Sequence, residues 1–516
     1  MKRKLLSLVL LLVATLTCAQ SDGSIDSSFG TNGKVTTDIY GFADEVNGLA
    51  IQNDGKILAA GFCRTSVDNQ DFCLVRYNQD GSLDTSFGTN GISSLDIRGG
   101  NTKDDVAVAV LIQSDGKIVL AGYTDANSST LPYYFALVRL NTDGSKDTSY
   151  ATDGILSFSF GDEAKAYKAI IQDNDKVIIV GELDGNSSEK QKFAVARIDA
   201  TGNLDTEFSV DGKQVINVGD SYDKALAVAL GADNKVFVGG RGNNVMSITK
   251  LTTSGDLDAS FNTNGIVTTD VDGTEDGVKA ILPLQNNKVL GVGVTYISGN
   301  DRDVVLIKYN ADGSVDTTFG TDGVIYTDID NGSEDIVQSA ILQSDGKFLI
   351  SGAMYSNGTS YSFILRYNSD GSLDTDFSND GKVIITYGSG FHATNSILLQ
   401  NDGKILIGGK FGEEHTNTSN FALARMYNHV LSISKFDSNL FSLSPNPVIS
   451  RMNIQSKLPI INYDIFDVKG RKVYSKKVTQ NSIKKMELDL ESLKTGLYMI
   501  KLKSASSYSV VKFLKE

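Results

Sequence analysis

The 516-residue sequence contains no tryptophan, 5 prolines, 3 cysteines and 3 histidines. The histidines, His392, His415 and His429, are too few and too scattered for a catalytic triad or a metal cluster to stand out. The sequence also lacks a Gly-x-Ser-x-Gly elbow, a His-Glu-x-x-His pair and a phosphate loop. An enzymatic interpretation therefore has little support, although catalytic residues drawn from different repeats stay open.

Long hydrophobic runs are lacking except near the N-terminus. There "MKRK" precedes the apolar stretch "LLSLVLLLVATL", and the small residues of "TCAQ" follow. This run is too short to cross a membrane and predicts a signal peptide over residues 1–19. A lipid on Cys18 is the alternative. No other segment is long enough for a transmembrane span.

Basic residues are scarce over most of the chain. Residues 430–516 hold 15 basic and 7 acidic residues, whereas the rest of the chain has a net charge of −22. An acidic body excludes the basic surface that nucleic-acid binding requires. The 50 glycines, set against few prolines, favour many tight β-turns over disorder.

Cysteine is too rare for a disulfide framework or a zinc site. After export, Cys63 and Cys73 remain, and they flank a short connection between two predicted strands. They could face each other and form a disulfide in an oxidising compartment, or stay as two buried thiols.

Internal repetition is what the sequence has in abundance. A motif typified by "YNADGSVDTTFGTDG" recurs seven times at a spacing of 53 to 63 residues. Its acid is Asp26, Asp84, Asp147, Asp205, Asp258, Asp316 or Asp374. Its aromatic residue, three positions later, is Phe29, Phe87, Tyr150, Phe208, Phe261, Phe319 or Phe377.

A second motif, typified by "IQSDGKIVLAG", alternates with the first. Its lysine recurs as Lys56, Lys117, Lys176, Lys235, Lys288, Lys347 and Lys404, and glycine always follows five residues later. Each unit then reads as four short strands separated by Asp-Gly turns and one variable loop. We call these strands a to d in chain order.

Four strands repeated seven times predict an all-β, seven-bladed β-propeller. The repeats begin with a strand d and end with a strand c at Phe421–Asn428, so we expect the N-terminal strand to complete the last blade. The predicted domains are the propeller at 20–429, a linker at 430–442 and a second domain at 443–516.

The two motifs resemble the delta-60 repeat family over about residues 21–428. The resemblance implies a secreted repeat protein with no established activity. The turns also look like those of NHL-type propellers.

The basic tail is predicted to be a small Ig-like β-sandwich. It resembles the type A C-terminal sorting domain of the type IX secretion system through "SPNP", "IFDVKGRKV", "LKTGLYMIKL" and "KFLKE". The resemblance implies export across the outer membrane of a Gram-negative bacterium, removal of the tail by a sortase-like peptidase, and surface attachment or release. The residues that carry the motif are Pro445, Asn446, Pro447, Asp467, Gly470, Arg471, Gly496, Tyr498 and Lys512.

Because a propeller binds one ligand at one face or channel, residues repeated in every blade are expected to build the blade. The repeated acid, turn and aromatic residue are therefore interpreted as a structural joint. The rival interpretation is a Ca²⁺ loop, since "NQDGSLD" offers oxygens at Asn78, Asp80 and Asp84. That loop lacks the first ligand and the bidentate glutamate of an EF-hand, and no other metal or cofactor is indicated.

A non-uniform position precedes the innermost strand of each blade. It is occupied by Ala164 in the third blade, His392 in the seventh, and acids elsewhere, namely Asp44, Asp105, Asp223, Asp276 and Asp335. Such acids could ring the channel mouth and attract a cation, a basic peptide or a cation-bridged glycan. The alternative is that they cap strand ends or solvate the rim.

The connection from Tyr123 to Tyr134 is long and offers three tyrosines, Tyr123, Tyr133 and Tyr134. Variable loops on a rigid ring often carry specificity, so these rings could stack on sugars or peptides, or pack the loop. The sequence thus predicts a secreted or cell-surface binding module for a glycan or protein ligand. A polymer-degrading hydrolase or lyase, and a structural surface component, are the alternatives.

Overall fold

Short strands and tight turns make up most of the described part of residues 21–428 in the computed structural model. The structure describes residues 21–66, 69–99, 104–125, 133–184, 191–219, 222–271, 274–298, 301–388, 390–412, 418–428, 441–456, 460, 462–467, 471–478, 484–503 and 508–516. The predicted signal peptide lies outside these residues. Contacts divide the chain into two units, 1–429 and 430–516.

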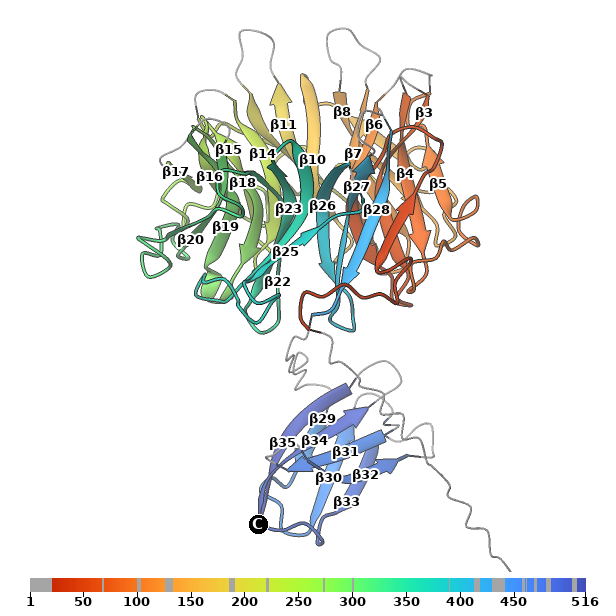
Figure 1. Ribbon diagram of the computed structural model, residues 1–516, viewed down its shortest axis with the longest axis vertical. Helices are drawn as coiled ribbons and strands as arrows, with labels where there is room; N and C mark the ends of the chain where they lie inside the picture. The colour runs from red at the N-terminus through yellow and green to blue at the C-terminus, as the bar shows by residue number, and fades with distance from the viewer. Residues whose placement is uncertain are drawn as a thin grey trace, which may run out of the picture. The chain divides into compact units, whose positions relative to one another are not determined.

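The first unit consists of seven antiparallel four-stranded blades, each with the strand order a-b-c-d (Figure 1). The first blade contains β2 (Asp44–Ile51), β3 (Ile57–Ser66), β4 (Asn69–Tyr77) and β5 (Ile92–Leu95), and the second contains β6 (Asp105–Ile112), β7 (Ile118–Asp125), β8 (Tyr133–Leu140) and β9 (Ile155–Phe158). The third contains β10 (Glu163–Ile171), β11 (Val177–Asp184), β12 (Lys192–Ile198) and β13 (Lys213–Ile216). The fourth contains β14 (Lys224–Leu230), β15 (Val236–Gly242), β16 (Val245–Leu251) and β17 (Ile266–Thr269).

The remaining blades follow the same plan. The fifth blade contains β18 (Thr274–Pro283), β19 (Val289–Ser298), β20 (Asp301–Tyr309) and β21 (Val324–Thr327). The sixth contains β22 (Glu334–Leu342), β23 (Phe348–Ser356), β24 (Thr359–Tyr367) and β25 (Lys382–Ile385). The seventh contains β26 (Phe391–Leu399), β27 (Ile405–Gly412), β28 (Ser419–Met426) and, from the N-terminus, β1 (Lys34–Thr37). A 3-10 turn, η1 (Gln285–Asn287), lies between β18 and β19.

The predicted closure of the ring is confirmed. Strand β1 pairs antiparallel with β28, with Lys34 opposite Ala424 and Thr37 opposite Phe421. Figure 1 accordingly shows strands from both ends of the propeller segment side by side. Pairing the first strand with the last blade removes a free sheet edge, which would otherwise invite association with other chains.

The hydrophobic core lies between neighbouring blades. One cluster, for example, joins Val119 and Leu137 of the second blade to Ala166 and Ile179 of the third. The second strand of each blade is apolar because it packs on both faces, and Ile118 to Ala121 are fully buried. Apolar burial between blades therefore stabilises the ring.

The repeated acid of the first motif is the centre of a buried ion-pair joint. The Oδ2 atom of Asp84 lies 2.8 Å from Lys56 Nζ and 2.7 Å from Arg76 Nε, while Oδ1 accepts hydrogen bonds from Ser86. Lys56 is the lysine of the second motif, so the two repeated motifs interlock. The same lysine–acid contact occurs in every blade, and the last uses Lys404 with Asp26 from the N-terminal strand segment.

The repeated aromatic residue links one blade to the next. The Arg76 guanidinium lies 4.3 Å from the Phe87 ring centroid, and Gly88 N–H donates to Asp143 O of the following blade. A Cβ atom at Gly144 would lie 2.8 Å from the same ring, and Gly144 has φ of 88°. Only glycine suits both the turn and this close approach. These contacts between neighbouring blades agree with the interpretation of the repeated motif as a structural joint.

Cys63 and Cys73 are joined in a disulfide, with Cα atoms 5.5 Å apart. They lie on the paired strands β3 and β4, where Cys63 is opposite Asp71 and Cys73 is opposite Gly61. Of the two alternatives left open by the sequence, the structure has the bonded one.

The second unit has two sheets. One contains β29 (Phe441–Ser444), β30 (Arg451–Ser456) and β33 (Lys485–Asp489); the other contains β31 (Asn462–Asp467), β32 (Lys472–Lys477), β34 (Gly496–Lys503) and β35 (Tyr508–Lys515). Met452 and Ile454 of the first sheet pack with Ile465, Ile500 and Phe513 of the second, which confirms the small β-domain.

The sorting-motif residues are distributed over this unit. The amide of Asn446 accepts from Leu514 N at 2.9 Å and donates to Lys512 O at 3.3 Å, so "SPNP" and "KFLKE" meet. Pro445 and Pro447 flank Asn446. In the second sheet Asp467 is opposite Tyr498 and Gly496 is opposite Lys515. Arg471 is exposed, and Gly470 lies outside the described residues.

Replacing Asp84 with alanine is expected to lower the free energy of unfolding by about 3–5 kcal/mol, because Lys56 and Arg76 would lose their buried counter-ion. Urea unfolding followed by circular dichroism measures this loss. Asp80 is the matched control, since it is an exposed acid in the same turn whose side chain accepts hydrogen bonds from Ser82. An Asp84→Ala variant no less stable than Asp80→Ala would contradict the joint.

Candidate functional site in the central channel

The predicted acidic ring does not face the channel mouth. Asp44, Asp105, Asp223, Asp276 and Asp335 are all fully buried. Each accepts a hydrogen bond from a backbone N–H in the loop that precedes its own strand, as Asp105 does from Ile97 at 2.7 Å and Asp223 from Val218 at 2.8 Å. The expectation of a carboxylate ring at the mouth was wrong, and the alternative that these acids cap strand ends describes them.

His392 occupies the same position in the seventh blade and likewise accepts a hydrogen bond from the loop that precedes its strand. Its Nδ1 atom accepts from Tyr387 N at 3.3 Å, and its ring is 1% exposed. It stacks against both Tyr387 and Phe411, at centroid distances of 5.8 and 5.3 Å. It therefore belongs to the packing of the loop.

Burial changes the titration of three of the capping acids. It raises the pKa of Asp44 to about 7, of Asp105 to about 6 and of Asp335 to about 7, against the lowering effect of their hydrogen bonds. Near Asp335, burial and the charges of Asp301 and Asp328 also raise the pKa of Asp303 to about 6.

Asp303, Asp328 and Asp335 place carboxylate oxygens within 4.8 Å of one another. Both oxygens of Asp335 already accept hydrogen bonds, from Ile329 N and Ser333 Oγ. These contacts make Asp335 part of the strand cap.

The three candidate tyrosines separate into two places. Tyr123 and Tyr133 lie edge to face at 5.2 Å, and Lys165 Nζ lies 4.7 and 5.0 Å from their ring centroids. Tyr134 instead contacts Arg98 at 5.2 Å. Residues 126–132 of this connection lie outside the described residues. Only Tyr123 of the three lines the channel pocket described next.

The innermost strand of every blade contains a β-bulge, and the side chains of the bulged residues line the channel. In β2, for example, the pairing register shifts between Val46 and Gly48, which leaves Asn47 as the extra residue. Such a residue is unpaired and its strand bends, so its side chain is re-aimed. The seven bulged residues are Asn47, Val108, Tyr167, Leu226, Lys279, Gln338 and Asn395.

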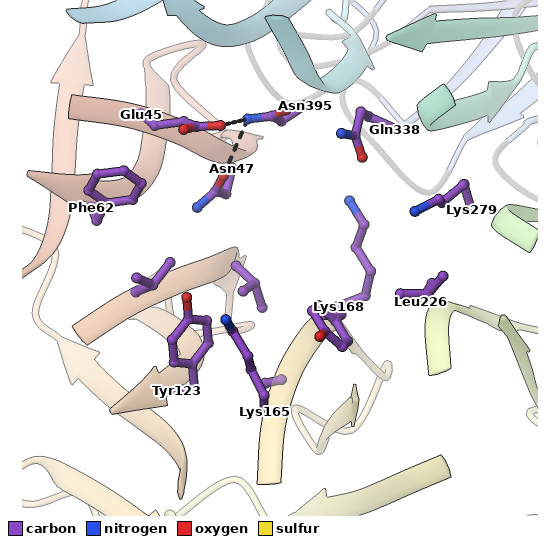
Figure 2. A pocket seen from close by; sticks show the side chains of 14 residues that line it. Glu45, Asn47, Phe62, Tyr123, Lys165, Lys168, Leu226, Lys279, Gln338 and Asn395 are labelled. Carbon is purple, nitrogen blue, oxygen red and sulfur yellow. Dashed lines mark hydrogen bonds between the residues drawn. The ribbon is translucent and has the colours of Figure 1, made fainter. Parts of the chain in front are cut away.

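All seven bulged residues line one pocket of about 390 Å³. Figure 2 shows their side chains and those of Glu45, Lys165 and Lys168 around a common space. On one side, the Asn395 amide donates to Glu45 Oε1 at 2.7 Å and to Asn47 Oδ1 at 3.3 Å. The blades therefore contribute different chemistry to the pocket.

The opposite side of the pocket carries Lys168 and Lys279. Burial lowers the pKa of Lys168 to about 8. Burial, with the positive charge of Arg241 and other bases, lowers the pKa of Lys279 to about 8. The channel is therefore basic where the sequence predicted acids.

Comparison with known families identifies both units. A family model described as a secretion system C-terminal sorting domain matches residues 442–516. A second, described as a domain of unknown function (DUF5122) β-propeller, matches seven segments, 52–87, 113–150, 172–208, 231–261, 284–319, 343–377 and 400–426. The chain belongs to the DUF5122 β-propeller family. Both resemblances noted from the sequence are confirmed.

The type IX sorting domain of this DUF5122 propeller indicates export to the cell surface or the extracellular space, and hence interaction with the type IX secretion machinery. Among the described residues, none forms a helix with the length and hydrophobicity needed to span a membrane.

Solved structures similar to the DUF5122 propeller have low identity. Sqt1 from Chaetomium thermophilum is 9% identical with a TM-score of 0.40, over 75% of this chain and 97% of that one. A protein of unknown function from Dyadobacter fermentans is 12% identical with a TM-score of 0.39, over 77% and 100%. PorZ of Porphyromonas gingivalis, a surface component of the type IX secretion system, is 9% identical with a TM-score of 0.22, over 96% and 86%. No curated protein sequence matches the chain.

Sequence reasoning missed the bulged residues of the DUF5122 propeller. A signal for them exists, because each lies three positions after the capping position, and its identity changes from blade to blade. The bulge itself is invisible in the sequence, where Lys279 and Gln338 read as ordinary positions of a strand.

Asp335 is expected to make stability fall with rising pH, which is opposite to the effect of the repeated acids such as Asp84, whose pKa is lowered by folding. Since its pKa is raised from 3.8 to about 7 by folding, its contribution is complete below pH 4 and is lost as pH rises through 7. Asp335→Asn keeps an acceptor for Ile329 N–H and should flatten the fall in melting temperature between pH 4 and 8. Calorimetry at several pH values measures this, with exposed Asp322→Asn as control. An unchanged pH profile would contradict the assignment.

Proposed function

We propose that the propeller is a non-catalytic binding module outside the cell and that its ligand enters the central channel. The observation that carries this proposal is the ring of seven bulged residues, which differ between blades while the joints between blades repeat. A lining that differs between blades joined by repeated contacts offers a place for recognition. The pocket volume of about 390 Å³ lies within the usual range for small-ligand sites.

Hydrolysis or lyase chemistry receives less support than binding. Among the described residues that line the pocket, Glu45 is the acidic one, and it pairs with Lys410 at 2.9 Å as well as with Asn395. General acid–base cleavage of a polymer usually needs two carboxyl groups with separate roles. A purely structural role would leave the seven bulge positions without a need to differ in charge and size.

An array of glycans and peptides probed with the exported protein tests this proposal. Leu226→Trp is the informative variant, because Leu226 is a bulged, half-buried pocket residue and the larger ring fills the channel without changing charge. A ligand found by the wild type should be lost in Leu226→Trp. Val210→Trp, at an 89% exposed position outside the pocket, is the control. Binding that survives channel filling would assign recognition to the loops instead.

The tail supports a second step of the proposal, in which residues 442–516 direct export and are then removed by a sortase-like peptidase of the secretion system. A chain that stops at residue 441 is expected to accumulate inside the cell, and the sorting domain fused to a reporter should carry the reporter out. Cell fractionation and immunoblotting measure both. Export of the truncated chain at the wild-type level would contradict this role.

A further inference from the structure

The channel contains cations that the protein itself does not neutralise. Lys224 lies 2.7 Å from Glu182, Arg302 lies 2.6 Å from Glu334, and Lys410 lies 2.9 Å from Glu45. Lys165 lies over the two tyrosine rings. Each of these bases near the channel therefore has a partner within the chain.

Lys168 and Lys279 differ from these neighbours. Within the part of the chain that the structure describes, neither ammonium group forms an ion pair or a hydrogen bond. Both side chains are half-buried in an otherwise acidic protein. The charges that act on Lys279 are all positive, coming from Arg241, Lys168, Arg302 and Lys224.

The two ammonium groups point into the same space. Figure 2 shows the Nζ atoms of Lys168 and Lys279 directed into the same part of the pocket, beside the Gln338 amide. Gln338 is bulged in β22, and no hydrogen bond joins its side chain to a described residue. Two cations and a free amide thus converge on one volume.

We infer that this part of the channel binds a carboxylate group of the ligand, held between Lys168 and Lys279 and contacted by the Gln338 amide. The inference rests on the proposed binding role of the channel and adds the chemical class of the ligand. A carboxylate held between the two ammonium groups offsets the repulsion between them. Each lysine offers a compact positive charge to a carboxylate oxygen, and the Gln338 amide N–H can donate to the same group.

The arrangement also explains why lysines are placed where they weaken the fold. Charged groups without counter-ions lose hydration on burial, and their mutual repulsion adds to that cost. A methionine of similar length would fill the same space without a charge. Residues that lower the stability of the fold and form no stabilising contact are typical of binding sites.

Calorimetric titration of the full exported protein with glucuronate, N-acetylglutamate, sulfate and glucose tests the inference. Both carboxylates should bind, glucose should not, and sulfate should bind more weakly than the carboxylates. Lys168→Met and Lys279→Met should each lower carboxylate affinity by about tenfold, the loss of one charge-assisted contact. Preference for glucuronate or for N-acetylglutamate assigns the carboxylate to a sugar acid or to a peptide.

Thermal unfolding separates loss of binding from loss of folding. Both methionine variants should melt at or above the wild-type temperature. Lys146→Met is the control, since Lys146 pairs with exposed Asp153 on a turn and should leave carboxylate affinity unchanged. Carboxylate affinity equal to wild type in both channel variants, or tighter binding of sulfate, would overturn the inference.

The channel and the carboxylate are tested separately. If Leu226→Trp abolishes binding of an array ligand while Lys168→Met and Lys279→Met retain it, the channel is the site and the carboxylate inference fails. If Leu226→Trp retains binding, the channel itself is not the site and the proposed function fails.

Discussion

The ion pair between the repeated aspartate and the repeated lysine is the interaction on which the ring depends. Asp84 lies in the connection between the third and fourth strands of its blade and joins two other parts of it, because Lys56 directly precedes the second strand and Arg76 lies on the third. Arg76 Nη1 also donates to Thr142 O of the following blade at 2.6 Å. One buried carboxylate thus fixes both the internal geometry of a blade and its distance from the next.

The hydrogen bonds at these joints outweigh the cost of burying the acid. At Asp258, burial alone would raise the pKa, but hydrogen bonds from Lys235 and Ser260 lower it to about 2. The carboxylate therefore stays ionised and supports the fold down to acidic pH. At the start of the innermost strand, Asp44 and Asp335 form no ion pair with a base among the described residues, and burial raises their pKa to about 7. Aspartate thus has two structural roles here: it stays ionised where a lysine or arginine pairs with it, and it caps a strand with a raised pKa where it forms no such pair.

Uniform joints leave the innermost strands free to vary. The bulge in each of these strands turns one side chain toward the axis, and the blade needs nothing from that side chain for its own pairing. Selection on a ligand can therefore change Lys279 or Gln338 without loosening the ring. This separation between repeated scaffold and variable lining is the physical basis for placing recognition in the channel.

The sequence alone determined the blade count, the four-stranded unit, the closure by the N-terminal strand and the sorting domain. These features follow from periodicity, turn residues and motifs, which are local in the chain. It also pointed to Asp44 and its counterparts as special, but not to where their side chains lie. Tertiary structure decided that these acids are buried caps, that Lys56 meets Asp84, and that Lys168 and Lys279 share a pocket. Bulges and ring closure bring together residues more than a hundred positions apart, and the orientation of a side chain at a bulge depends on a pairing shift that leaves no mark in the residue pattern.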